Sequence, residues 1–212
     1  RLPLGSEYSL FKIKMKGLGS NDFLLNEKLV AYNSLNPSTA INKNNPREFN
    51  FFMQRMQWTI NGRTWEARGV AEEETVKLNT TEIWQFSNKG GNMMGGNGMM
   101  GDGGMMDGGG GMMGRGSEDG GMGNMMQMPH PVHIHQVQFN VLERDTSEMD
   151  PSVWESIKDG FIDEGWQDTV LLMPGMEIKV IMHFSDFKGL FLYHCHNLEH
   201  EDMGMMRNFK IT

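Results

Sequence analysis

The sequence predicts an all-β protein, a sandwich or a Greek-key barrel, because many short strand-like segments are separated by turn residues. Such turn signals are Asn61-Gly62, Pro174-Gly175 and Lys188-Gly189. We expect strands at 49–60, 81–86, 132–143, 168–173, 177–184, 190–195 and 206–211. One segment favours a helix, 150–160, where Pro151 suits the first helical position.

The N-terminal part differs from the rest of the chain. Residues 8–16 alternate apolar and polar side chains as a strand does, and 17–46 is a Gly-, Asn-, Ser- and Pro-rich stretch that indicates a linker. A single strand is not stable alone. We therefore expect residues 1–16 to end a preceding domain that lies upstream of Arg1, and 47–212 to form a C-terminal domain.

A low-complexity insert occupies residues 88–128. It consists mostly of Gly, Met, Asn and Asp, and it holds 12 of the 22 methionines. This composition cannot bury enough surface to offset the entropy of the chain, so we expect a long disordered loop within the C-terminal domain.

Composition excludes several classes of function. The net charge of −8 argues against a nucleic-acid partner, because there is no basic patch to face phosphates. No apolar run approaches the roughly 20 residues that a membrane helix needs. The single cysteine, Cys195, excludes an internal disulfide bond.

Six of the seven histidines fall in two short motifs, "HPVHIH" and "HCHNLEH". In each motif two histidines are two residues apart on an expected strand, so they share one face of it: His133 with His135, and His194 with His196. Cys195 must then point to the opposite face. One strand would deliver two imidazoles to one metal site and a thiolate to another, whereas His183 stands apart and is expected to be structural.

The side of the thiolate can recruit two more histidines and a thioether. The candidates are His130, which Pro131 holds extended, His200 and, as a weak axial ligand, Met205. Two His, one Cys and an axial Met make the trigonal blue-copper site of one-electron transfer. Zinc is disfavoured because structural zinc sites use paired cysteines. Four imidazoles on the other side suit copper, zinc or iron, and the neighbouring thiolate makes copper the consistent choice.

The two motifs, with "GWQDTVLLMPG" between them, resemble the C-terminal copper-binding motifs of the multicopper oxidases, the laccase-like and cuprous-oxidase enzymes. The resemblance covers about residues 47–212 and implies a cupredoxin-like Greek-key β-sandwich. It assigns ligands of the type 1 copper to His130, Cys195, His200 and Met205. His133 would bind the type 2 copper, and the type 3 pair would be bound by His135, His194 and His196. Glu201 matches an acidic residue that assists proton delivery.

The same resemblance implies an activity and a set of partners. A reductant, Cu(I) or a phenol, would give up electrons singly at the type 1 copper, and dioxygen would be reduced to two waters at a three-copper cluster. That cluster needs eight histidines and this chain has four, so N-terminal cupredoxin domains would supply the others. By analogy with the family, a periplasmic or extracellular location is expected.

Two positions bear on the details. Many family members have Gly after the "HxH" pair, where this chain has Gln136, and we expect the strand to bend less there. The methionine-rich insert ends close to His130, and thioethers favour Cu(I). Because some bacterial cuprous oxidases carry similar inserts, we expect Met126 and Met128 to help capture Cu(I), although Met126 stands where those enzymes have an acidic residue.

Two other functions remain open from the sequence. A single-copper electron-transfer cupredoxin explains Cys195 but leaves the paired histidines without a purpose. A copper-binding or copper-storage protein explains the insert but not Cys195. A related copper nitrite reductase is disfavoured by His196, the second histidine beside the cysteine.

Overall fold

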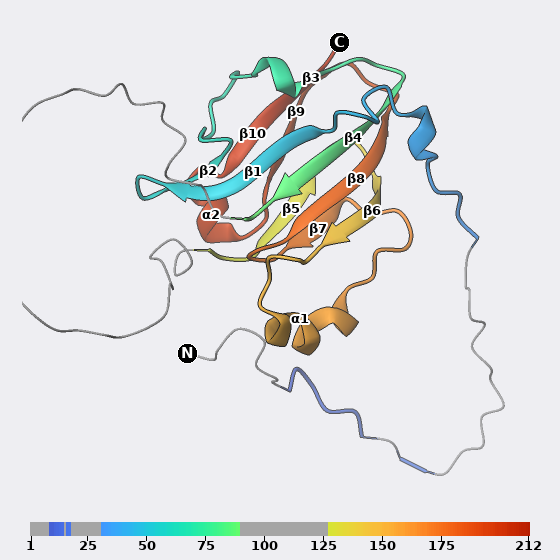
Figure 1. The fold of residues 1–212 in the computed structure, drawn as a ribbon, viewed down its shortest axis with the longest axis vertical. Helices are drawn as coiled ribbons and strands as arrows, with labels where there is room; N and C mark the ends of the chain where they lie inside the picture. The colour runs from blue at the N-terminus through green and yellow to red at the C-terminus, as the bar shows by residue number, and fades with distance from the viewer. Residues whose placement is uncertain (1–8, 15, 18–30, 90–126) are drawn as a thin grey trace, which may run out of the picture.

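A computed structural model describes residues 9–14, 16–17, 31–89 and 127–212. Two five-stranded sheets stack face to face, with the strand orders β2-β1-β4-β8-β6 and β3-β10-β9-β5-β7 (Figure 1). The first sheet contains β1 (Arg47–Gln54), β2 (Gln57–Ile60), β4 (Thr80–Ser87), β6 (Phe139–Asp145) and β8 (Glu177–Phe184). The second contains β3 (Thr75–Val76), β5 (His130–Ile134), β7 (Thr169–Leu172), β9 (Gly189–Cys195) and β10 (Met206–Ile211). Most sheet neighbours are not consecutive in sequence, so the chain crosses repeatedly between the layers and forms the expected β-sandwich.

An aromatic cluster fills the space between the sheets. The Trp84 ring lies 4.7 Å from Phe49, 5.7 Å from Tyr193 and 5.6 Å from Phe209, measured between ring centroids. All four side chains are fully buried. They come from both layers, so their packing fixes the second sheet, which carries the histidine motifs, against the first.

The segment 49–60 is a hairpin, and the prediction of one continuous strand was wrong. β1 and β2 pair antiparallel from Phe51↔Ile60 to Gln54↔Gln57. Arg55 and Met56 form the turn with φ of 49° and 64°. Positive φ at both central residues is the geometry of a tight type I′ hairpin turn. Arg and Met rarely adopt positive φ. The sequence lacks the Asn-Gly pair that usually marks such a turn, and the hairpin was therefore not predicted.

The segment 132–143 was also predicted as one strand and is two, in different sheets. β5 pairs with β7 and β9, whereas β6 pairs with β8. The break falls at Gln136, whose φ is 75°. Gln136 takes the left-handed conformation that Gly adopts easily, and its Nε2 donates to the Ser185 carbonyl at 2.6 Å. The expectation that Gln136 bends the strand less is therefore corrected.

Two short helices flank the sheets. α1 (Pro151–Ile157) begins as predicted, with Asp150 Oδ1 accepting from the amides of Ser152 and Val153 at 2.7 and 3.3 Å. A 3-10 turn, Lys158–Gly160, follows it. α2 (Leu198–Asp202) was not predicted, because five residues are too few to show a helical period.

A buried ion pair ties the second sheet to the 3-10 turn Glu72–Glu74. The Glu74 carboxylate accepts from Arg207 Nε and Nη2, both at 2.8 Å, and from the Tyr193 hydroxyl at 2.9 Å. Glu74 and Arg207 are 2% and 3% exposed. Burial and the nearby Glu74 carboxylate raise the pKa of Tyr193 well above its usual value. This pair joins β9 and β10 to a distant part of the chain.

The expected linker is partly packed on the sandwich. Ala40 is buried against Ile83 and Ile181, and the Asn42 side chain exchanges two hydrogen bonds of 2.8 Å with the Ile83 backbone.

Residues 9–14 lie in no strand (Figure 1). Their assignment to a preceding domain stays a prediction. Residues 90–126, most of the expected loop, lie outside the described residues.

Candidate metal centre

The end of β9 separates two groups of histidines. Successive strand side chains point to opposite faces, so Cys195 and His194 face different sides of the second sheet. His194 is opposite His133 of the neighbouring strand, and Cys195 is opposite Val132. The alternation expected from "HCH" is therefore present where the histidine motifs of β5 and β9 lie side by side.

The first group consists of His130, Cys195 and His200. Cys195 Sγ lies 3.4 Å from His130 Nδ1 and 3.5 Å from His200 Nδ1, and the two Nδ1 atoms are 3.2 Å apart. His130 is the first residue of β5, and α2 turns the chain so that His200 returns to the cysteine. Three soft or borderline donors converge on one point without a carboxylate, as thiolate–imidazole metal sites require.

Met205 lies directly beside this group. Its amide donates to the His200 carbonyl at 2.9 Å, and its own carbonyl accepts from the Cys195 amide at 3.1 Å. The side chain is fully buried. These bonds fix Met205 to two of the three donors, a position compatible with the predicted axial role.

Burial controls the protonation of the first group. It raises the pKa of the Cys195 thiol to about 11 and lowers the pKa of His130 to about 3, helped in the second case by His200. The pKa of His200 is also lowered by burial. The imidazoles are therefore neutral and able to donate lone pairs, whereas the thiol needs a cation to become a thiolate at neutral pH.

The second group lies on the other side of β9. Ring nitrogens of His133, His135 and His194 lie within 4.8 Å of one another, and His135 Nε2 is 3.2 Å from His194 Nε2. The His196 ring is 5.4 Å from that of His194 and 5.7 Å from that of His133. Burial is the largest cause of the lowered pKa of His135 and of His194. Three of the four histidines that were predicted for this side therefore converge, and the His196 ring lies beside them.

Side chains around the second group orient its imidazoles. His133 Nδ1 lies 2.9 Å from the Asp168 carbonyl and 2.9 Å from Thr169 Oγ1. Glu201 Oε2 lies 3.5 Å from His194 Nδ1. Hydrogen bonds such as the two at His133 fix the tautomer and orientation of histidines that bind metals. Glu201 thus faces the second group, although its neighbour His200 faces the first.

The remaining candidates have separate environments. Met126 lies outside the described residues. Met128 is 39% exposed, and its carbonyl accepts from Asn88 Nδ2 at 2.9 Å. Asn88, which sequence reasoning missed, thereby joins the two ends of the insert beside His130. His183 Nδ1 lies 2.9 Å from Thr81 Oγ1, which agrees with its structural interpretation.

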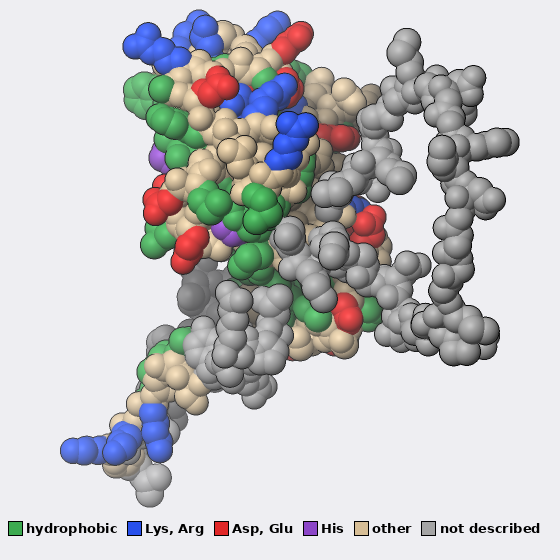
Figure 2. Space-filling view, turned by 90° about the vertical axis from the view of Figure 1, so that its left-hand side faces the viewer, with side chains coloured by type: hydrophobic (Ala, Val, Ile, Leu, Met, Phe, Trp, Pro, Cys, Tyr) green, Lys and Arg blue, Asp and Glu red, His purple; other side chains and the backbone are tan. Residues whose placement is uncertain are grey.

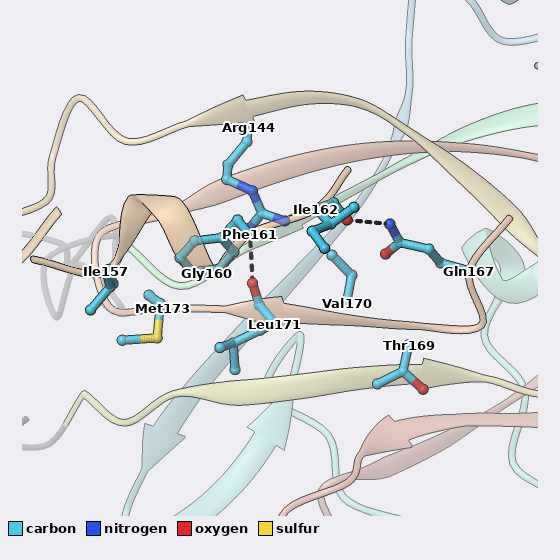
Figure 3. Close-up of a pocket in the computed structure, with 10 residues that line it drawn as sticks. All are labelled: Arg144, Ile157, Gly160, Phe161, Ile162, Gln167, Thr169, Val170, Leu171 and Met173. Carbon is cyan, nitrogen blue, oxygen red and sulfur yellow. Dashed lines mark hydrogen bonds between the residues drawn. The ribbon is translucent and has the colours of Figure 1, made fainter. Parts of the chain in front are cut away.

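A separate apolar cavity of about 410 Å³ lies between β7 and the segment that follows α1 (Figure 3). Arg144 contributes its charged group, which lies 4.4 Å from the Phe161 ring and donates to Asp163 at 2.6 and 3.0 Å. That charge is already paired. None of the predicted copper ligands lines this cavity.

One face of the molecule shows histidine surface beside apolar side chains (Figure 2). Of the second ligand group, His196 is exposed, and His133 and His135 are partly exposed. Among the described helices, none is long and apolar enough to cross a membrane. Together, these features define a β-sandwich with two candidate metal sites, one of cysteine and histidines and one of histidines alone.

Comparisons with known proteins identify the family. The family model for multicopper oxidases matches residues 119–212. Bilirubin oxidase from Albifimbria verrucaria is 28% identical over 176 residues, which are 83% of this chain and 24% of that protein. The multicopper oxidase mco from Staphylococcus haemolyticus is 30% identical over 154 residues, 73% of this chain and 24% of that protein. The chain belongs to the multicopper oxidase family.

Solved structures support the fold. A laccase from Pediococcus acidilactici superposes with a TM-score of 0.57 at 24% identity, covering 91% of this chain and 31% of that one. The predicted cupredoxin-like fold is confirmed by such neighbours. The chain spans about a quarter of the length of the curated relatives that it matches.

Proposed function

We propose that this chain is the C-terminal cupredoxin domain of a multicopper oxidase that takes electrons singly from a reductant and reduces dioxygen to water. The observation that carries the proposal is the position of Cys195. Its sulfur faces His130 and His200. Of the histidines covalently next to it, His194 belongs to the second group, and the His196 ring lies 5.4 Å from that of His194. Cys195 would thus bind one metal through its sulfur, and one peptide bond on each side would join it to a histidine of the other site.

The donor set supports copper. His130, Cys195 and His200, with Met205 as axial ligand, would hold the type 1 copper. On the other face, His133 would bind the type 2 copper, and the type 3 coppers would be bound by His135, His194 and His196. Copper in these sites supplies one-electron redox chemistry. Burial of the first group excludes water from the thiolate, and the neutral imidazoles leave their lone pairs free.

Glu201 is the proposed proton-delivering residue. Its carboxylate lies 3.5 Å from His194 Nδ1 and is partly open to solvent, with 32% of the side chain exposed. A carboxylate at the rim of a histidine cluster can take a proton from water and release it toward the cluster. Glu201→Gln should slow oxygen reduction and leave the reduction of the type 1 copper unchanged.

The second group is half of the site that the chemistry requires. Four further histidines are proposed to come from N-terminal cupredoxin domains, whose last segment would lie within residues 1–16. The coverage of about a quarter of each curated relative supports this proposal. A periplasmic or extracellular location is proposed by analogy with the family.

Cu(I) and phenols are the proposed reductants. Several relatives are named laccases, and one is named bilirubin oxidase. The insert 88–128 supplies methionines, among them Met126 and Met128, that favour Cu(I). Deleting 90–123 should abolish the preference for Cu(I) and keep phenol oxidation. Unchanged Cu(I) oxidation in that deletion variant would refute the capture role.

The deciding experiment measures intact mass and copper content on the same purified sample. About four coppers, on a polypeptide well above 24.1 kDa or on a tightly held assembly, support the complete oxidase. One copper on a chain of 24.1 kDa would mean a single-copper cupredoxin and would refute the proposal.

A further inference from the structure

An indole covers the two histidines of the first ligand group. The Trp58 ring lies 4.1 Å from the His200 ring, with 32° between the planes. Its edge meets the His130 ring at 5.5 Å and 72°. One aromatic side chain from the first sheet thus contacts both imidazoles, although it donates no ligand atom.

The hairpin of β1 and β2 holds this indole in place. Trp58 is opposite Met53 in the register, and the hydroxyl of the adjacent Thr59 donates to the Phe52 carbonyl at 3.0 Å. Trp58 is 6% exposed and belongs to the main hydrophobic core. A side chain packed this closely in a paired strand keeps one orientation, so the indole forms a fixed wall.

This wall restricts access to the predicted electron-entry site. His130 is fully buried and His200 is 2% exposed. Phe51 adds a second aromatic ring 5.9 Å from His130. Electron transfer weakens steeply with distance, so a reductant reacts fastest when it touches a ligand imidazole. The indole already occupies the face of His200 on which a planar aromatic reductant would stack.

We propose that Trp58 is a specificity-determining residue, whose indole keeps bulky aromatic reductants farther from His200 than small ones. This inference rests on the proposed function, because it assigns the reductant size that the same type 1 site accepts. Trp58 touches the ligands and the approaching reductant through its ring alone. Its effect is therefore steric, and shortening the side chain should relieve it.

The test compares two reductants with the same reacting group and different bulk. Unsubstituted hydroquinone and 2,5-di-tert-butylhydroquinone are oxidised by the copper-loaded complete polypeptide that carries this chain. The measured quantity is the ratio of kcat/KM for the bulky over the small reductant. In Trp58→Ala this ratio should rise about 10- to 200-fold, the range for a changed hydrophobic pocket. A change in copper potential acts on both reductants and largely cancels in the ratio.

Two variants act as references. Trp58→Phe keeps an aromatic ring of smaller size and should raise the ratio less than Trp58→Ala. Trp65→Ala removes a nearby, 46% exposed tryptophan whose amide donates to the Gly204 carbonyl, and it should leave the ratio unchanged. An increase in Trp58→Ala that Trp65→Ala matches would overturn the proposal.

Fluorescence gives a readout that does not depend on turnover. Copper loading should quench the emission of Trp58, because its ring contacts two ligand imidazoles, and Trp58→Phe should lose that part of the quenching. Should Trp58→Ala not fold, Trp58→Phe and this measurement decide. An unchanged ratio in Trp58→Phe together with no Trp58 quenching overturns the proposal.

Different outcomes would refute the proposed oxidase and the role of Trp58. A wild-type protein that binds no copper, or shows no blue absorption band, refutes the proposed oxidase and with it the role of Trp58. A blue, active enzyme whose Trp58→Ala variant keeps the wild-type ratio within about twofold refutes the role of Trp58 alone.

Discussion

Acid should destabilise the copper-free protein through His130. This imidazole is fully buried, and within the described part of the chain its Nε2 has no hydrogen-bond partner. Burial, and then the nearby His200, lowers its pKa from 6.5 to about 3. As the pH falls below 6.5, His130 therefore binds a proton in the unfolded chain but stays neutral in the folded protein. The contribution of the neutral His130 to stability is fully present above pH 6.5 and is lost as the pH falls from 6.5 to about 3.

The size of the effect follows from linkage. One proton of difference changes the free energy of unfolding by about 1.4 kcal/mol per pH unit. The two pKa values are about 3.5 units apart, so His130 alone should remove about 5 kcal/mol across this window. That is comparable with the whole stability of a small domain, about 5–15 kcal/mol.

The assay is urea unfolding of the chelator-treated protein at several pH values from 7.5 to 4, followed by circular dichroism. His130→Gln removes the titrating group, so its free energy of unfolding should fall less steeply with decreasing pH than that of the wild type. The two slopes should differ by about 1.4 kcal/mol per pH unit, the value for one proton. His183→Gln, at an exposed position of β8, is the matched control and should keep the wild-type slope. Equal slopes for wild type and His130→Gln would refute the reasoning.

Three further substitutions test the centre and the frame around it. Cys195→Ser should abolish the blue absorption band and all turnover while circular dichroism stays native, and a persisting band would reject Cys195 as the ligand. Met205→Leu should keep copper bound and change its reduction potential, because an axial thioether tunes it; an unchanged potential in redox titration would point to another axial group. Glu74→Ala should cost about 3–5 kcal/mol, because it leaves Arg207 buried without its partner. Glu74→Leu combined with Arg207→Met should cost less in urea unfolding, and an equal cost would show that the ion pair is not the cause.

Local patterns predicted much of the fold because strand alternation and turn residues act over a few positions. β8 and β10 have the predicted bounds, and β4, β7 and β9 differ from them by one or two residues. The predictions failed where the backbone takes an unusual conformation at an ordinary residue. Arg55, Met56 and Gln136 have positive φ without being Gly or Asn. The pairing of β1 and β2 offsets the cost of this conformation at Arg55 and Met56, and the hydrogen bond to the Ser185 carbonyl offsets it at Gln136. A local sequence pattern does not predict these contacts.

The spacing of histidines beside Cys195 determined by itself that one strand would serve two sites, because alternate side chains of any strand face opposite ways. Only the tertiary structure decided what surrounds those sites. α2 returns His200 to the thiol, Glu201 faces His194, and Trp58 covers His200 from the other sheet. Trp58 and His200 are about 140 residues apart in the chain, and their contact depends on how the two sheets pack rather than on any short-range preference. The contacts of His200 and Glu201 span only a few residues, but they depend on the turn that α2 makes after β9.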